Sequence, residues 1–150
     1  MNPRETINDI LVNLFNEIWK LEEDAIITEE FKDITNNDMH IIEAIGLSGE
    51  NTMSMVAKKM GITAGSLTTS VNGLVNKKYV VRQRREQDRR VIFLRLTPKG
   101  VKAYEHHQEY HRQMTDAVIG TLGEEEIPVL IKTLKGLSDF FRGYKDRIQN

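Results

Sequence analysis

The sequence predicts a mainly α-helical protein with one small β-hairpin, and three observations support this fold class. Apolar residues recur at helical spacing near both ends of the chain, over about residues 3–27 and 98–148. Two short β-branched runs, residues 79–81 and 91–96, flank a polar segment in the middle. The length of 150 residues suits a single domain, 1–150, with a core of its own.

The composition is that of an ordinary globular protein. Hydrophobic residues make up 39% of the chain and charged residues 29%, which argues against disorder. The absence of cysteine excludes disulfides, zinc thiolate sites and cysteine nucleophiles. The first ten residues, MNPRETINDI, lack a signal-peptide pattern, and no apolar run approaches the roughly 18 residues of a membrane span. We therefore expect a cytoplasmic protein.

The first predicted helix covers residues 3–27. Its apolar positions are three and four residues apart and form one long stripe, which requires a partner surface. The stripe consists of Ile7, Ile10, Leu11, Leu14, Phe15, Ile18, Trp19, Leu21 and Ala25.

Two short helices are predicted next, over residues 38–45 and 53–60. The candidate N-caps of the first are Thr35, Asn36 and Asn37. The second has Thr52 as its N-cap and ends at Gly61, where glycine permits a positive φ angle.

A fourth helix is predicted from Ala64 to about Lys78, with Thr63 as its N-cap. One face is apolar and consists of Leu67, Val71, Leu74 and Val75. The other faces carry small, uncharged residues of mediocre helix propensity: Gly65, Ser66, Thr68, Thr69, Ser70, Asn72 and Asn76. An ordinary solvated helix more often carries Glu, Lys and Arg there, so these residues suggest contact with a ligand.

The segment that joins the two predicted strands is strongly basic. Between Lys77 and Arg90 there are seven basic residues and two acidic ones, a local charge of +5, in a chain whose net charge is -1. The rest of the chain therefore carries -6, and the positive potential is confined to one segment. Such a distribution indicates a polyanionic partner.

Two further helices are expected after the hairpin. Thr97 caps the first, and Pro98 occupies its first position, where the missing N–H costs nothing. This helix is expected to continue to about Leu122. The last helix is expected from Glu124 to about Ile148, with three glutamates in the first turn, where the helix dipole favours negative charge.

The order of these elements is that of a winged helix-turn-helix over about residues 35–97. The short helix 53–60 and its turn place the next helix where it can enter a major groove. The basic hairpin, or wing, can place arginine in a minor groove. Asp88 is expected to orient Arg90, two residues along an extended strand, through a charge-assisted bond, and Arg84 is expected across the hairpin.

The segment TAGSLTTSVNGLVNKKYVVRQRREQDRRVIFLRLTPKG, residues 63–100, resembles the MarR family of bacterial transcription regulators. The resemblance implies a homodimer on a pseudo-palindromic operator in double-stranded DNA, with dimerisation helices at about 3–27 and 98–148. It also implies that Arg90 enters the minor groove. Many relatives have arginine or lysine near Thr69, which this chain lacks. The expected DNA-binding residues are Thr63, Ser66, Thr68, Thr69, Asn72, Arg82, Arg84, Arg85, Asp88, Arg89 and Arg90.

A narrower resemblance is to the MarR-type repressors of fatty-acid biosynthesis genes, carried by EEFKDITNNDMHIIEAIG, GSLTTSVNGLV and EQDRRVIFLRLT. It implies that a long acyl chain on acyl carrier protein acts as corepressor. The acidic carrier would need a second basic patch, for which Lys20, Lys32, Lys58 and Lys59 are the candidates. The acyl chain would need an apolar tunnel, for which we select Leu14, Phe15, Ile18, Met39, Ile42 and Met55, although these residues could equally fill a core.

Two alternatives concern metal and catalysis. His107 and His111 are four residues apart on one helix, beside His106, and Glu17, His40 or Glu43 could approach them to form a zinc site. Such histidines are more often simply solvated or hydrogen-bonded, so we expect no cofactor and no metal. The sequence contains no G-x-S-x-G, H-E-x-x-H, P-loop or dinucleotide-binding motif, so we do not expect an enzyme.

Overall fold

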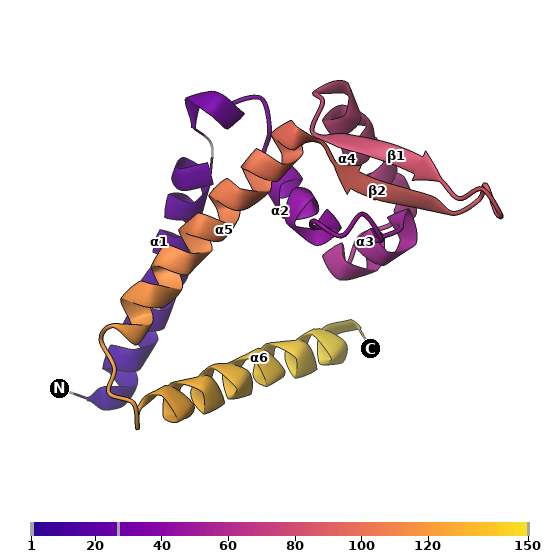
Figure 1. Ribbon diagram of the computed structural model, residues 1–150. Coiled ribbons are helices and arrows are strands. Elements are labelled where there is room, and N and C mark those ends of the chain that lie inside the picture. The colour runs from indigo at the N-terminus through magenta and orange to yellow at the C-terminus, as the bar shows by residue number, and fades with distance from the viewer. Residues whose placement is uncertain (1, 27, 150) are drawn as a thin grey trace. The chain divides into compact units, whose positions relative to one another are not determined.

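A computed structural model describes residues 2–26 and 28–149 and confirms a mainly helical fold with one hairpin (Figure 1). Ile27, which the first predicted helix included, lies outside the described residues. The elements are α1 (Pro3–Ile26), the 3-10 turn η1 (Glu29–Phe31), α2 (Asn36–Ile45), α3 (Met53–Met60), α4 (Ala64–Asn76), β1 (Val80–Arg84), β2 (Ile92–Leu96), α5 (Pro98–Ile119) and α6 (Ile127–Gln149).

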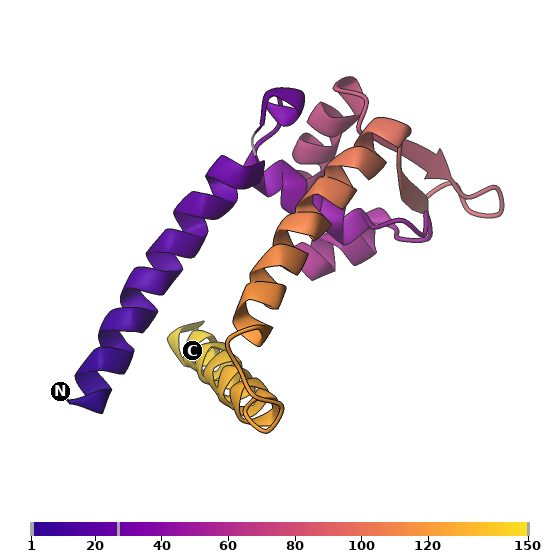
Figure 2. The ribbon, with the colours of Figure 1, turned by 60° about the vertical axis from the view of Figure 1, so that its left-hand side comes forward.

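The chain divides into two compact units, one that ends at Tyr110 and one from His111 onward. The first contains α1 to β2 and most of α5, and the second contains the end of α5 and all of α6. Within the first unit, the hairpin projects from the group formed by α2, α3 and α4 in both views (Figures 1 and 2). Among the described residues, no helix is long and apolar enough to cross a membrane.

Threonine side chains fix the starts of the three short helices. Thr35 forms a capping box with Asp38, in which each side chain bonds to the other residue's backbone N–H at 3.0 and 3.1 Å. The hydroxyl oxygens of Thr52 and Thr63 accept from backbone N–H groups three residues later, at 3.2 and 3.1 Å. Gly61 ends α3 with φ of 65°, as expected.

Several predicted boundaries are wrong. Helix α4 ends at Asn76, because Lys78 has a φ angle of 71° and turns the chain into β1. Helix α5 ends at Ile119 and α6 begins only at Ile127. The three glutamates before α6 form a turn, and the Glu126 carboxylate accepts from the Gly123 N–H at 2.7 Å. Strand β1 runs from Val80 to Arg84, so it extends three residues beyond the predicted run 79–81.

The two strands are antiparallel, with Val80 opposite Leu96 and Arg84 opposite Ile92. The loop before α3 adds to this sheet, because the Leu94 N–H donates to the Asn51 carbonyl at 2.9 Å. The wing is therefore anchored to the start of α3 as well as to α4.

The hydrophobic core lies in the winged region of the first unit. Its buried side chains come from η1 to β2, with Ala103 from α5: Phe31, Ile34, Met39, Ile41, Ile42, Ile45, Val56, Ala57, Leu67, Val71, Leu74, Tyr79, Val80, Leu94, Leu96 and Ala103. Burial of each Leu, Ile or Val side chain contributes about 1.5–3 kcal/mol. Because Leu67, Val71 and Leu74 hold one face of α4 inward, its small polar face is turned outward.

Candidate nucleic-acid interface

The outward face of α4 consists of exposed hydroxyl and amide side chains. Ser66, Thr68, Thr69 and Asn72 are exposed, as is the cap residue Thr63. The Thr68 hydroxyl donates to the Ala64 carbonyl at 2.8 Å, and the Thr69 hydroxyl donates to the Gly65 carbonyl at 3.2 Å. Since the hydroxyl protons are used within the helix, the oxygens present lone pairs outward, and the methyl groups are available to apolar base edges.

The wing tip holds an arginine in a fixed orientation. Arg90 donates to Asp88 from Nε at 3.0 Å and from Nη2 at 3.2 Å, and its backbone N–H bonds to the same carboxylate at 3.1 Å. The side-chain bonds from Arg90 lower the pKa of Asp88 below its ordinary value. The Arg90 side chain remains 90% exposed. The predicted pairing is therefore present, and Asp88 directs one edge of the guanidinium while the other edge faces solvent.

The neighbouring Arg84 and Arg85 bond to backbone carbonyl groups of the hairpin loop and its end. Arg84 does lie across the hairpin, but its Nη1 donates to the Arg89 carbonyl at 2.9 Å and not to Asp88. The Arg85 N–H donates to the Val91 carbonyl at 2.9 Å. These bonds close the loop and keep the side chains of Arg85 and Arg89 on the exposed surface.

A side-chain bond joins the wing to α4. Arg82 of β1 donates from Nη2 to the Asn72 side-chain oxygen at 2.5 Å. The sequence predicts DNA contact for each of these two residues, but it does not predict their bond to each other. Because this bond occupies the Asn72 oxygen, the amide nitrogen is left as the group that can donate to a base or phosphate.

The comparisons with known proteins agree with this geometry. A model of the MarR family matches residues 32–91. FarR of Neisseria gonorrhoeae, an HTH-type transcriptional regulator, is 32% identical over 101 residues, which cover 67% of this chain and 68% of FarR. The chain belongs to the MarR family.

Two other similar proteins strengthen the assignment. MhqR of Bacillus subtilis, also an HTH-type regulator, is 28% identical over 63% of this chain and 66% of its own length. The crystal structure of Streptococcus pneumoniae FabT in complex with DNA is also similar, with a TM-score of 0.84 and 39% sequence identity. The similarity covers 94% of this chain and 99% of the FabT chain. This MarR protein is therefore a DNA-binding transcriptional regulator with a winged helix-turn-helix fold.

The six residues selected for an acyl tunnel in this MarR protein differ in how far they are buried. Met39 and Ile42 are fully buried in the core, whereas Leu14, Phe15 and Met55 are 43, 49 and 46% exposed. Ile18 is partly buried. An acyl chain would reach Met39 and Ile42 only if the core opened, so the tunnel stays a prediction.

Two of the four lysines proposed as a carrier-protein patch have other roles. Lys59 donates to the Ala44 carbonyl at 3.3 Å and to the Asn51 side chain at 3.1 Å, so it binds the end of α2. Lys32 pairs with Glu29 at 3.4 Å. Lys20 and Lys58 are exposed.

Of the residues predicted to form a zinc site, the structure brings His40, Glu43 and His107 together in the first unit, whereas His106 bonds elsewhere. His106 bonds to the Ala25 carbonyl at 2.9 Å and lies 5.2 Å from the Phe31 ring. The buried His107 instead lies 3.3 Å from Glu43 and near His40, with one ligand atom of each of these three within 4.8 Å of the others.

Glu22 adjoins this group, with its Oε1 atom 3.4 Å from His40 Nε2 and 3.9 Å from His107 Nε2. Sequence reasoning missed Glu22, because only the fold brings α1 to α2 and α5. His111 belongs to the second unit, and Glu17 is exposed on α1.

Proposed function

We propose that this MarR protein is a dimeric repressor of fatty-acid biosynthesis genes that binds a pseudo-palindromic operator. The observation that carries the proposal is the likeness to FabT, which extends over 94% of the chain at 39% identity and which was solved with DNA bound. A relation this close over nearly the whole length supports a similar role for the two proteins, and not only a similar fold.

In this proposal α4 lies in the major groove and the wing tip in the minor groove. The acceptor oxygens and methyl groups of Thr68 and Thr69 suit the amino groups and thymine methyls on base edges. Arg90, held flat by Asp88, enters the minor groove, where a weakly hydrated guanidinium is favoured. Arg82, Arg84, Arg85 and Arg89 neutralise phosphates.

Exposed apolar faces support the dimer. Helix α1 exposes the large side chains Ile7, Ile10, Leu14, Phe15, Trp19 and Leu21. Helix α6 exposes Val129, Ile131, Leu134, Phe140, Phe141, Tyr144 and Ile148. Apolar surface of this extent marks an interface, and we assign both helices, with α5, to dimerisation.

The proposed corepressor is a long-chain acyl group on acyl carrier protein. The decisive experiment titrates promoter DNA of a fatty-acid synthesis operon with the protein, alone and with acyl carrier proteins of several chain lengths. We expect long acyl chains to increase operator affinity and the carrier without an acyl chain to have no effect. Equal affinity under all conditions would remove the corepressor, and no preference for this promoter over unrelated DNA would remove the fatty-acid role.

A zinc-responsive regulator is the second candidate, favoured by the group formed by His40, Glu43 and His107. Bonds from zinc to nitrogen and oxygen are about 2.0–2.2 Å long, so two ligands of one ion lie no more than about 4 Å apart. The separations of 3.7 Å from His40 to Glu43 and 3.3 Å from His107 to Glu43 meet this limit. Two imidazoles and a carboxylate are also a suitable donor set for zinc.

The test for zinc uses untagged protein stripped with a chelator and titrated with Zn²⁺. If the group binds zinc, His40→Gln weakens binding at least tenfold, whereas His106→Gln, which alters a neighbouring histidine outside the group, leaves it unchanged. A parent protein that binds no stoichiometric zinc would eliminate this candidate.

A further inference from the structure

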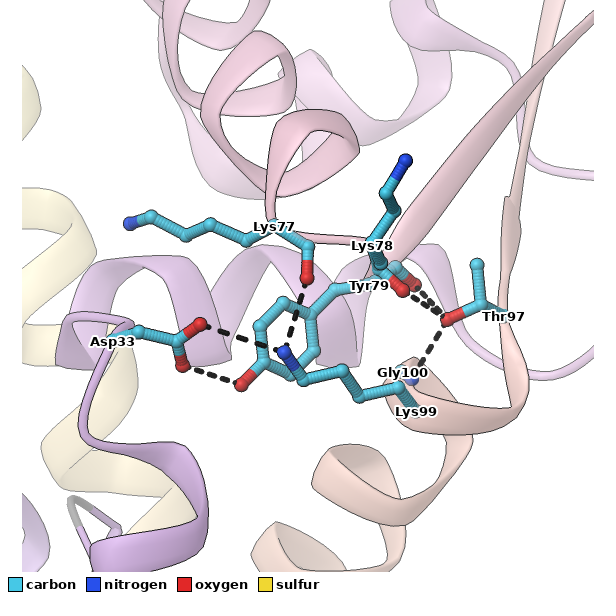
Figure 3. A network of polar contacts seen from close by, with 7 residues as sticks. All are labelled: Asp33, Lys77, Lys78, Tyr79, Thr97, Lys99 and Gly100. Atoms are coloured by element: carbon cyan, nitrogen blue, oxygen red, sulfur yellow. Dashed lines mark hydrogen bonds and ion pairs between the residues drawn. The ribbon is translucent and has the colours of Figure 1, made fainter.

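Three segments that are distant in sequence meet at the C-terminal end of α4 (Figure 3). Asp33 comes from the connection between α1 and α2, Tyr79 follows α4, and Lys99 lies in the first turn of α5. We call these three residues the joint. They are separated by up to 66 positions in the chain.

The centre of the joint is a buried phenol. The Tyr79 hydroxyl donates to Asp33 Oδ1 at 2.6 Å, and the Tyr79 side chain has no exposed surface. This bond lowers the pKa of Asp33 below its ordinary value, and burial together with the bond raises the pKa of Tyr79. The carboxylate therefore stays ionised and holds the phenol in one orientation.

Lys99 joins the other two residues of the joint to the C-terminal end of α4. Its Nζ lies 4.3 Å from the centre of the Tyr79 ring, 3.5 Å from Asp33 Oδ2 and 3.1 Å from the Lys77 carbonyl. Lys77 is the C-cap of α4, and a carbonyl there carries the negative end of the helix dipole. One ammonium thus contacts the connection, the aromatic ring and the helix end together.

The backbone beside the joint fixes α5 in the same place. The Thr97 hydroxyl lies 2.5 Å from the Lys78 carbonyl, to which it donates, and it accepts from the Gly100 N–H at 3.1 Å. The Thr97 N–H donates to the Tyr79 carbonyl at 3.0 Å. The first turn of α5 is consequently docked on the residues that connect α4 to the wing.

The joint contains none of the residues that we assign to DNA, and it lies beyond the C-terminal end of α4. Thr69 precedes Lys77 by two helical turns, which corresponds to about 12 Å along the axis of α4. A change at the joint alters the tilt of α4 and the root of the wing without removing a group that contacts bases. Helix α1 leads into the connection that carries Asp33, and α5 begins with the turn that carries Lys99, so a movement of either long helix can reach α4 through the joint.

We infer that Asp33 and Lys99 are positioning residues for operator binding, which set the orientation of α4 and the wing through Tyr79. The inference rests on the proposed placement of α4 in the major groove, but not on any role in fatty-acid synthesis. The test therefore uses an operator that the parent protein selects from a random DNA pool, so that its result does not depend on the fatty-acid role.

The test compares operator affinity at several salt concentrations for the parent, Asp33→Asn, Lys99→Met and the double variant. Each single change is expected to weaken binding by roughly three- to thirtyfold, the range for residues that act without touching the ligand. The double variant should lose little more than the single ones, because both changes open the same joint. The slope of log affinity against log salt should equal that of the parent.

Matched controls separate positioning from loss of charge and from unfolding. Lys102→Met removes an exposed lysine one turn further along α5 and should bind as the parent does. Tyr79→Phe keeps the buried ring, removes the bond to Asp33 and should resemble Asp33→Asn. Circular dichroism at the assay temperature establishes that each variant is folded.

Three results would overturn the inference. Folded Asp33→Asn and Lys99→Met proteins that bind as tightly as the parent would show that the joint does not position α4. A salt slope reduced by about 1.8 for the Lys99→Met dimer would make Lys99 a phosphate ligand instead. A parent protein that selects no DNA would refute the placement of α4 itself.

Discussion

Replacement of Gly100 by alanine tests the docking of α5 on the end of α4. Gly100 is buried in the first turn of α5, and a Cβ atom built on it overlaps the Tyr79 carbonyl oxygen. The same Cβ would lie 3.1 Å from the Tyr79 carbonyl carbon and 3.2 Å from the Leu96 Cβ atom. The obstacle is backbone, so no side-chain rotation relieves the clash, and α5 or the chain at Tyr79 has to shift.

Three contributions determine how much Gly100→Ala changes the free energy of unfolding. Overpacking costs about 1–3 kcal/mol, and loss of the bond from the Thr97 N–H to the displaced Tyr79 carbonyl costs about 1 kcal/mol more. The higher helix propensity of alanine stabilises the folded state by about 1 kcal/mol. We therefore expect a net loss of about 1–3 kcal/mol, and a fall in Tm of about 2–4 °C for each kcal/mol lost.

The assay is urea unfolding at fixed protein concentration, because the stability of a dimer depends on concentration. Gly73→Ala is the matched control, since Gly73 lies within α4 and a Cβ there meets nothing within 4 Å. It should stabilise the protein by about 0.5–1 kcal/mol. A Gly100→Ala protein as stable as the parent would refute the close approach of α5 to Tyr79.

Three further predictions concern the wing, a cap and the joint. Arg90→Ala should lower the salt slope of operator binding by about 1.8 per dimer, and an unchanged slope in filter-binding measurements would contradict the assigned role of the tip. Thr63→Ala removes the N-cap of α4 and should cost about 1 kcal/mol in urea unfolding, whereas a cost near zero would contradict the cap. Because folding lowers the pKa of Asp33, the stability advantage of the parent over Asp33→Asn should be constant above about pH 5. It should vanish as the pH falls through the folded-state pKa, and an advantage that persists in strong acid would exclude the ionised carboxylate.

Local signals in the sequence were sufficient for most of the fold. The caps at Thr52 and Thr63, the glycine after α3 and the Asp88–Arg90 pairing depend on residues no more than four positions apart. The structure confirms each of them. Short-range hydrogen bonds and amphipathic spacing are the features that a sequence displays directly.

The errors arose where distant residues decide the local structure. Lys77 and Lys78 have side chains that favour a helix, yet α4 ends before them. Their carbonyl groups accept hydrogen bonds from Lys99 and Thr97, which are distant in the sequence. The joint depends on contacts between residues 46 and 66 positions apart. The same reason explains why Glu22 was not predicted: His40 and Glu43 do meet His107, but Glu22 joins them only because the fold brings α1 to α2 and α5.

The bond from Arg82 to Asn72 links the wing to α4 and limits how far the wing tip can move relative to that helix. In the proposed complex α4 occupies a major groove and Arg90 the adjacent minor groove, and the spacing between these grooves varies with base sequence and stiffness. A duplex whose groove spacing does not match that of α4 and Arg90 has to deform before both engage. The protein should therefore discriminate among base pairs that no side chain touches, with a preference for steps that narrow the minor groove where Arg90 enters.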